Sequence, residues 1–331
     1  MMMAKFPMTP ADRARCALEL GIPDEVPTFE LEFQLADLMF GRPLMTPELA
    51  SDELEKLSSL ERERAVIAAA DYAAEVYDAL DYAIVPAYGP GSERFWETGE
   101  VGPDLALYFR RLHERFGGRR MLGWHGDGTF SIPDGNEMYD FAYAIADDYE
   151  GVLARADAMA EAAIRRNQKL AQAGVEVLLL CSDYCYNSGP FMSPAMFADL
   201  ITPYLARICA AGRANGQYVI KHTDGNIMPI LDQLVQANPH ALHSLDPMAG
   251  VDIREVKRLV GDRVALCGNV HCAALQTGTE AEVRASAEYC LTWGKEGGGY
   301  IFATSNVPFK GMPVDRYELI LEIWREMRRY D

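Results

Sequence analysis

Residues 221–226 read KHTDGN and place a basic residue, an imidazole, a hydroxyl, a carboxylate and an amide within one short stretch. The stretch follows the β-like run QYVI and precedes IMPILDQLV, which has the pattern of a helix start. Three uses suit these residue types: metal binding, proton transfer and helix capping. The first two depend on His222 and Asp224, which stand two positions apart.

Polar clusters of the same kind follow other β-like runs of the chain. They are WHGDG (124–128), CSDYCYN (181–187), SLDP (244–247), GNVHC (268–272) and TSN (304–306). Taken alone, each cluster has an ordinary structural interpretation, such as a buried histidine, a turn or cap residue, or a packing aromatic. Independent structural roles do not require polar groups to recur at successive strand ends, whereas a single active site does.

The elements that carry these clusters alternate between β-like and helical patterns. The β-like runs are 81–87, 119–125, 175–181, 217–222, 241–246, 263–269 and 300–306. Such a repeat fits either an open doubly wound sheet or a closed (β/α)₈ TIM barrel with one strand not yet located. In a barrel every strand end faces one mouth, so the recurrence of polar clusters favours the barrel.

Helical periodicity is strongest over residues 149–173 and 193–215, the second of which opens with Ser-Pro and closes near Gly216. No internal boundary follows residue 75. The sequence therefore predicts a helical N-terminal extension over residues 1–75, packed on a barrel formed by residues 76–331.

Composition limits the classes of function. The chain has 331 residues, a formal net charge of −18, 49% hydrophobic residues and 24% charged residues. This charge repels nucleic acid phosphates, and no apolar run approaches the roughly 20 residues needed to cross a bilayer. The seven cysteines are scattered and odd in number, which favours reduced thiols. We expect a cytoplasmic globular protein that binds neither nucleic acid nor membrane.

Four stretches carry a resemblance to a known family: YNSGPFMSPAMF (186–197), KHTDGNIMPILD (221–232), DPMAGVDIREVKRLVGDRVALCGNV (246–270) and GGGYIFATSNVPFKGMPVDRYELILE (297–322). Together they resemble the uroporphyrinogen decarboxylase superfamily, and in particular its branch of corrinoid-dependent methyltransferases. The resemblance is dense over roughly residues 175–325 and faint before them. It implies a barrel enzyme that moves a methyl group to or from a cobamide.

The superfamily contains a second chemistry, the decarboxylation of tetrapyrroles. Decarboxylases of the family carry an arginine-rich N-terminal motif of the form RQAGRYLPEY, and no such motif occurs here. Arginine forks would bind the many carboxylates of the substrate, so their absence and the charge of −18 disfavour this lyase activity. The resemblance then implies a methyltransferase that acts on a methoxylated small molecule, with an aromatic ether as one candidate and a methylated amine or betaine as the alternative.

The methyltransferase branch often binds zinc through a His-x-Cys pair and a distant cysteine. Here His222 matches the histidine, but Asp224 and the region of Ser305 stand where the cysteines would be. The loss of thiolates argues against a thiol as the methyl acceptor. His222 and Asp224 either bind zinc as a Lewis acid or form a proton-transfer pair without metal; we expect little bound metal.

The resemblance also implies roles for further residues. Asp183 is expected to orient His222 and Asp224, and the cobalamin is expected to arrive on a partner corrinoid protein that docks at the barrel mouth. The remaining residues are expected to bind the substrate: Trp124, His125, Tyr184, Tyr186, Asn187, Asn226, Asp246, Asn269 and Ser305. Of these, the aromatic residues suit an aromatic or cationic substrate.

Overall fold

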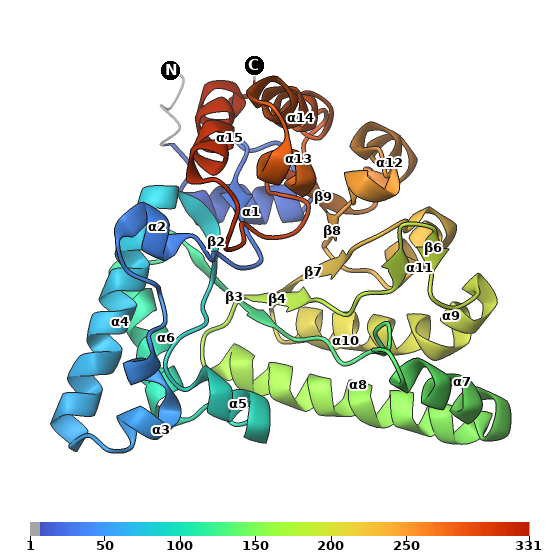
Figure 1. Cartoon of the computed structure of the whole chain (residues 1–331), viewed down its shortest axis with the longest axis horizontal. Helices are drawn as coiled ribbons and strands as arrows, with labels where there is room; N and C mark the ends of the chain where they lie inside the picture. The colour runs from blue at the N-terminus through green and yellow to red at the C-terminus, as the bar shows by residue number, and fades with distance from the viewer. Residues whose placement is uncertain (1–6, 331) are drawn as a thin grey trace, which may run out of the picture.

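The structure, a computed structural model, describes residues 7–330 and is built around one parallel sheet. The order of its strands is β1-β2-β3-β4-β7-β8-β9-β10. Their bounds are β1 (Thr28–Phe29), β2 (Tyr82–Pro86), β3 (Met121–His125), β4 (Val177–Leu180), β7 (Tyr218–Thr223), β8 (Ala241–Ser244), β9 (Ala265–Cys267) and β10 (Tyr300–Ile301). A parallel bridge between Thr28 and Phe302 joins the first strand to the segment after the last. The sheet therefore closes into the predicted (β/α)₈ barrel (Figure 1).

The strand that the sequence did not locate is β1. It pairs with β2 through Thr28–Tyr82 and Phe29–Ile84, with a shift of register between the two pairs. It lies within residues 1–75, for which the sequence predicted a helical extension, so that segment contributes one barrel strand besides its helices. Two residues are too few to produce the alternation of apolar and polar side chains by which strands are predicted. The barrel therefore begins near residue 28 rather than after residue 75.

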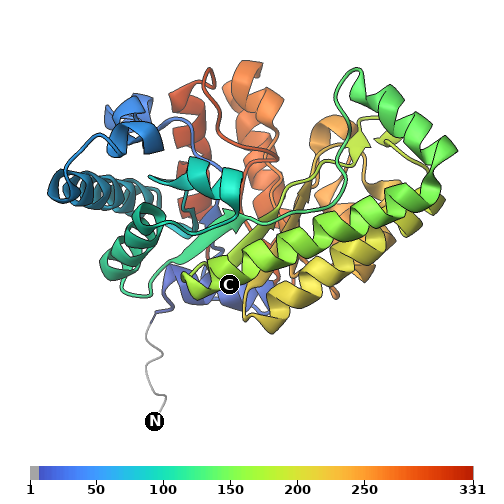
Figure 2. The ribbon, with the colours of Figure 1, turned by 90° about the horizontal axis from the view of Figure 1, so that it is seen from below.

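Helices surround the strands. Their bounds are α1 (Pro10–Leu18), α2 (Ala36–Phe40), α3 (Ser51–Leu54), α4 (Ser59–Leu80), α5 (Ser92–Thr98), α6 (Pro103–Phe116), α7 (Glu137–Asp147), α8 (Tyr149–Gln172), α9 (Pro194–Leu200), α10 (Thr202–Ala214), α11 (Leu231–Gln236), α12 (Ile253–Val260), α13 (Cys272–Thr277), α14 (Glu280–Trp293) and α15 (Val314–Met327). Short 3₁₀ turns occur at η1 (Pro47–Leu49), η2 (Met228–Ile230) and η3 (Pro247–Ala249), and β5 (Cys185–Tyr186) pairs with β6 (Gly189–Pro190) as a hairpin. Figure 2 shows α8 and α10 side by side along one flank.

The helix predicted over residues 193–215 is two helices. Ser193 caps α9 by accepting a hydrogen bond from the backbone N–H of Met196, as the Ser-Pro pair predicts. The helix then breaks at Ile201, and Pro203 stands in the first turn of α10. Proline lacks the N–H of an internal helical bond and its ring crowds the preceding turn, so a helix restarts at it more readily than it continues through it.

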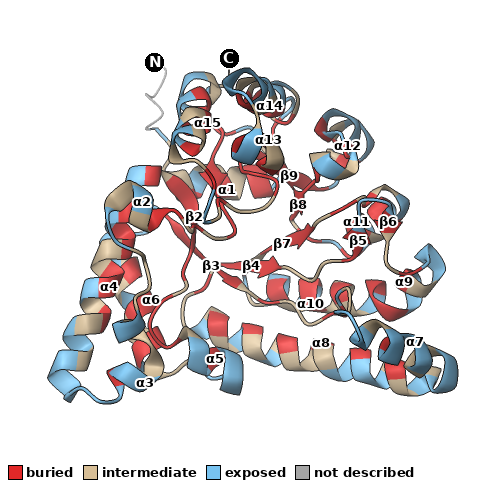
Figure 3. Cartoon of the chain, viewed as in Figure 1, coloured by how far each residue is buried: buried red, intermediate tan, exposed pale blue. Residues whose placement is uncertain are grey.

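The apolar core has an outer and an inner part. The outer part fills the space between strands and helices, and the strands are buried along nearly their whole length (Figure 3). The inner part lies within the barrel and includes Ile84, Met121 and Val177, which pack with Ala14 and Leu18 of α1. Helix α1 thus plugs one end of the barrel, and the polar strand ends occupy the other.

Two further findings concern the whole described chain. All seven cysteines are free thiols, which confirms the prediction that none forms a disulfide. None of the helices within residues 7–330 combines the length and the apolar character that crossing a membrane requires.

Candidate active site

Asp183, His222 and Asp224 form a cluster at the mouth of the barrel. Asp183 follows β4, while His222 and Asp224 stand in and directly after β7, which is the neighbour of β4 in the sheet. The Nε2 of His222 lies 3.7 Å from Oδ1 of Asp183 and 3.8 Å from Oδ1 of Asp224. One potential ligand atom from each of the three residues lies within 4.8 Å of the other two. Parallel strands bring their carboxyl ends to one edge, which is why Asp183 can meet His222 and Asp224, which stand 39 and 41 positions later in the sequence.

The imidazole of His222 is held from behind by a second histidine. Its Nδ1 lies 2.9 Å from Nδ1 of His243, which stands opposite it on the neighbouring strand β8. Burial, reinforced by the charge of Lys221, lowers the pKa of His222 to about 3, and burial lowers the pKa of His243 well below its ordinary value. Both rings are therefore neutral, and one Nδ1 donates its proton to the other. When His222 is the donor, its Nε2 presents a lone pair to the two carboxylates.

Asp224 is held by hydrogen bonds on both oxygens. The hydroxyl of Ser244 donates to Oδ1 at 2.6 Å, and the amide of Asn306 donates to Oδ2 at 2.5 Å. Its backbone N–H donates to Asp183 at 3.0 Å. Burial and the nearby carboxylates of Asp183 and Asp246 raise the pKa of Asp224 to about 6, although the two hydrogen bonds oppose the rise. Asp224 can therefore exchange a proton close to neutral pH.

The loop after Asp224 turns sharply under the hairpin that follows β4. Gly225 has a φ of +82°, and a Cβ there would lie 2.3 Å from the carbonyl oxygen of Cys185, so only glycine fits. Its N–H donates to Asp246 at 3.3 Å. The side chain of Asn226, rather than that of Asp224, accepts from the N–H of Met228 where the 3₁₀ turn η2 begins. The carboxylate of Asp224 is thereby left free to face His222.

Comparison with known proteins identifies the family. Residues 135–327, more than half of the chain, match the family described as uroporphyrinogen decarboxylase (URO-D). The chain belongs to this family. Its fold is similar to that of a methyltransferase from Methanosarcina mazei, with a TM-score of 0.72 and 17% identity over 97% of this chain and 99% of that one.

Weaker likenesses extend to other barrels. The 3-keto-D-glucoside 4-epimerase YcjR from E. coli has a TM-score of 0.43 and 11% identity over 79% of this chain and 94% of that one. A GH5-4 endoglucanase from an uncultured bacterium has a TM-score of 0.49 and 10% identity over 98% of both chains. A search of curated proteins found no match.

A buried ion pair beneath the cluster was not predicted from the sequence. Lys221 is fully buried, and its Nζ donates to Asp127 and to the carbonyl of Ser182, each at 2.8 Å. The ammonium also lies 4.0 Å from the centre of the Tyr184 ring. Burial by itself would raise the pKa of Asp127. The charge of Lys221 and the hydrogen bonds donated to the carboxylate have the larger effect, and they lower this pKa to about 2. A lysine within the apolar strand YVIKHT was the available signal.

Two of the aromatic residues expected to contact substrate lie in the core instead. Trp124 is fully buried and packs edge-on against Phe95 and Phe109 in the outer core. Tyr184 is also fully buried, against Phe197. Trp124 points away from the mouth because consecutive residues of a strand face opposite sides of the sheet, and His125 takes the inner side.

The other expected substrate residues are spread more widely than the three-residue cluster. Tyr186 is 46% exposed in the β5–β6 hairpin, and Asn187 is exposed in its turn. Asn269 is buried and donates to the carbonyl of Leu245 at 2.6 Å, which gives it a structural bond. Ser305 is buried after β10, where its backbone N–H donates to Val270. In the segment after β10 it is Asn306, not Ser305, whose side chain donates to Asp224.

His125 stands at the end of β3, beside two other aromatic rings. Its ring centre lies 5.0 Å from that of Tyr88 and 6.2 Å from that of Trp96. Burial lowers the pKa of His125, against the opposing charges of Glu32 and Asp127. Its Nε2 is buried and has no hydrogen-bond partner among residues 7–330. His125 is thus a neutral polar group at the inner wall of the mouth.

Proposed function

We propose that the protein is a methyltransferase that moves a methyl group from a methoxylated small molecule to the cobalt of a corrinoid carried by a partner protein. Membership of the uroporphyrinogen decarboxylase family and full-length fold similarity to a methyltransferase support this proposal. The observation that carries it is the cluster of Asp183, His222 and Asp224 at the barrel mouth.

The cluster suits the difficult part of ether demethylation. The methyl carbon passes to cobalt(I) as its bond to oxygen breaks, and the oxygen departs with the bonding electron pair as an alkoxide or phenolate. That oxygen needs a proton or a cation as its negative charge develops. Asp224 supplies the proton in this scheme, because burial raises its pKa to about 6 and a fraction of the carboxyl groups is protonated near neutral pH.

His222 and Asp183 position this proton. The neutral Nε2 of His222 lies 3.8 Å from Asp224, too far for a direct hydrogen bond, but within reach of an oxygen placed between them. Asp183 accepts the backbone N–H of Asp224 and so fixes the loop that carries the acid. Its side chain is 41% exposed, which leaves the cluster open to a substrate entering from the mouth.

The same residues fit a divalent cation such as zinc. His222 would supply Nε2, and Asp183 and Asp224 would each supply an oxygen. Ligand atoms about 2 Å from a tetrahedral zinc lie roughly 3.3 Å from each other, close to the 3.7 and 3.8 Å found here. A bound zinc would act as a Lewis acid on the leaving oxygen. Oxygen ligands in place of thiolates disfavour a thiol as the methyl acceptor.

Tetrapyrrole decarboxylation, the second chemistry of the family, fits the site less well. Three carboxyl groups, those of Asp183, Asp224 and Asp246, lie at the mouth. A substrate with many carboxylates would be repelled there. The proposal therefore places this chain with the methyltransferases of the family.

The test measures methyl transfer directly. Purified protein is mixed with cob(I)alamin and methoxylated phenols, and methylcobalamin is followed by its absorbance. We expect His222→Ala to slow transfer by about 100-fold, a loss typical of a catalytic group or metal ligand. His240→Ala is the matched control, because His240 lies before β8, at the opposite end of the barrel. Equal rates in the two variants would refute the role of His222.

The metal content of the purified protein distinguishes the two proposed roles of the cluster, proton transfer and zinc binding. If Asp224 acts as the acid without metal, the isolated protein carries negligible zinc, and Asp224→Asn abolishes the fall in rate that wild type shows as the pH rises through about 6. If the three residues bind zinc, the protein carries it stoichiometrically, and chelation removes activity that added zinc restores. Asp224→Cys should then raise zinc affinity, because it restores the His-x-Cys spacing.

A further inference from the structure

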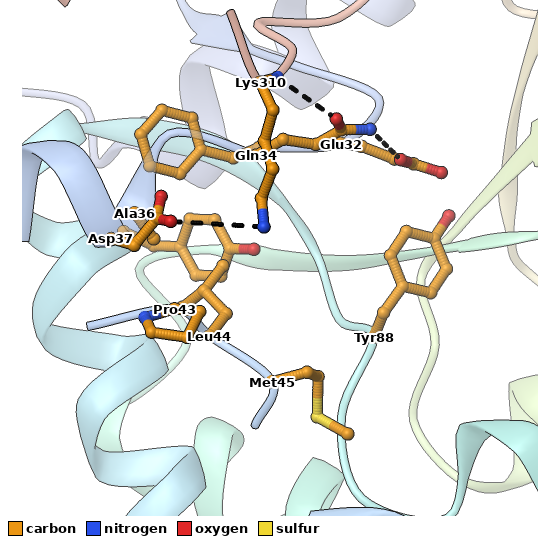
Figure 4. A pocket seen from close by; sticks show the side chains of 11 residues that line it. Glu32, Gln34, Ala36, Asp37, Pro43, Leu44, Met45, Tyr88 and Lys310 are labelled. Carbon is orange, nitrogen blue, oxygen red and sulfur yellow. Dashed lines mark hydrogen bonds and ion pairs between the residues drawn. The ribbon is translucent and has the colours of Figure 1, made fainter. Parts of the chain in front are cut away.

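A pocket of about 350 Å³ lies at the barrel mouth, beside the cluster rather than within it. It is bounded by the segment after β1, by residues 43–45, by Tyr88 after β2 and by Lys310 after β10. Figure 4 shows these side chains around a common space. The volume is at the small end of the range of ligand-binding pockets, and it suits a single-ring molecule.

The charge within this pocket is negative and only partly neutralised. Glu32 and Asp37 both line it, together with one cation, Lys310. The ammonium of Lys310 lies 4.0 Å from Asp37 and so is paired with that carboxylate. Glu32 accepts a hydrogen bond of 3.1 Å from the amide of Gln34, and no Lys, Arg or His among residues 7–330 forms an ion pair with it. One carboxylate in the pocket therefore lacks a compensating positive charge.

Aromatic rings form the walls next to this carboxylate. Phe33, Tyr77 and Tyr88 line the pocket, and the hydroxyl of Tyr88 points toward its Glu32 end (Figure 4). That hydroxyl is buried beside the backbone N–H of His125, yet it has no hydrogen-bond partner of normal geometry among residues 7–330. The hydroxyl of Tyr77, in contrast, donates to the carbonyl of Pro86 at 3.1 Å.

We infer that this pocket binds an organic cation, with its ammonium group between Glu32 and the ring of Tyr88. An unpaired carboxylate beside aromatic faces is the combination that attracts such a group, since charge and ring quadrupole act together. An N–H of the ammonium can donate to the carboxylate of Glu32, while the ring of Tyr88 contributes its quadrupole. Anionic ligands of the same shape are repelled by Glu32.

One wall of the pocket contacts the strand next to the one that leads to the cluster. Tyr88 touches His125, and β3, which carries His125, pairs directly with β4, which leads to Asp183. Only the identification of this ligand as the methyl donor depends on the proposed function. Such a donor carries either an ammonium group on a methoxylated ring or the transferable methyl group on nitrogen itself.

Three ligands that differ in charge test the inference by calorimetry. They are 4-methoxybenzylamine, 4-methoxybenzyl alcohol and 4-methoxybenzoate, which share a methoxylated ring and are positive, neutral and negative at pH 7. We expect the amine to bind at least about 10-fold more tightly than the alcohol, and the benzoate to bind more weakly than both. Equal binding of amine and alcohol would overturn the inference.

Variants locate the effect within the pocket. Glu32→Gln keeps the shape of the side chain and should abolish the preference for the amine. Asp37→Asn is the matched control, because it removes the same charge from a carboxylate that is already paired; we expect it to change binding by less than about 3-fold. An equal loss in both variants would show a general field effect and contradict a direct contact with Glu32.

The binding experiment needs neither corrinoid nor turnover, so it can fail separately from the proposed function. Tight amine binding without methyl transfer would leave the pocket assignment standing and refute the methyltransferase proposal. Methyl transfer from neutral methoxyphenols, without any preference for amines, would support the methyltransferase proposal and refute the pocket assignment. Unchanged thermal unfolding of the Glu32→Gln variant confirms that the comparison concerns binding rather than folding.

Discussion

Replacing Lys221 by methionine should destabilise the protein far more than an ordinary surface substitution. Lys221 is fully buried, and methionine fills a similar volume without the charge. The change leaves Asp127, whose side chain is only 10% exposed, as a carboxylate without its cation. Removing one partner of a buried ion pair typically costs about 3–5 kcal/mol of folding free energy.

The structure places the expected cost at the lower end of that range. Asp127 keeps three backbone donors, the N–H groups of Gly128, Thr129 and Ser182 at 2.7, 3.0 and 3.0 Å, and the hydroxyl of Thr129 at 2.8 Å. These hydrogen bonds still stabilise its charge after Lys221 is removed. The variant also loses the contact of the ammonium with the ring of Tyr184. We therefore expect a loss of about 3 kcal/mol.

Urea unfolding of a double-mutant cycle measures this coupling. Lys221→Met combined with Asp127→Asn should cost at least about 2 kcal/mol less than the sum of the single variants, because it leaves no unpaired charge. Lys56→Met is the control: Lys56 is 63% exposed beside Glu53, and its loss should cost under about 1 kcal/mol. Additive effects in the cycle, or a Lys221 variant no less stable than the control, would refute the reasoning.

The stability contributed by the ionised Asp127 carboxylate should depend on pH. Because the folded protein lowers the pKa of Asp127 from 3.8 to about 2, the stability from its ionisation is present above pH 3.8. It is lost as the pH falls toward 2. The difference in stability between wild type and Lys221→Met should therefore shrink over that interval.

Two further predictions concern other buried groups near the mouth. Glu30 is 2% exposed, and burial raises its pKa to about 8 despite the hydrogen bonds donated by Thr304 and Tyr317. Wild type should thus lose stability as the pH rises from 4.5 to about 8. Because Glu30→Gln stays neutral, urea unfolding should find this variant several kcal/mol more stable than wild type at pH 9 but not at pH 5. A difference that does not depend on pH would contradict this. His243→Ala should lower kcat for methylcobalamin formation about 10-fold with little change in KM, because His222 loses the partner of its Nδ1. His243→Asn, whose amide oxygen can accept the same bond, should recover part of the rate, and equal rates in the two variants would reduce His243 to a packing role.

The family of this chain and most of its fold could be read from local sequence. Seven of the eight barrel strands were predicted as β-like runs, six of which carry a polar cluster at their end. Strands β2, β3, β4, β8, β9 and β10 lie within these runs, and β7 extends one residue beyond its run. KHTDGN contained the central histidine and carboxylate of the cluster. These features are local, because each depends on the order of residues within about ten positions.

Other features were decided only by tertiary structure. Strand β1 is two residues long and is defined by its neighbours β2 and Phe302, not by its own pattern. The side of the sheet that Trp124 faces, and the core contacts of Tyr184, were also set by tertiary structure, which buries both rings.

The hydrogen-bond partners of His222, Asp224 and Lys221 likewise could not be predicted from the sequence. His243 behind His222, Asn306 on Asp224 and Asp127 on Lys221 come from distant positions of the chain. The residue types at the mouth were determined by the sequence alone, since six of the strands end in their own polar residues. Which of them meet was determined by closure of the barrel, because neighbours across a sheet are set by strand order and register, and these depend on the packing of the whole chain.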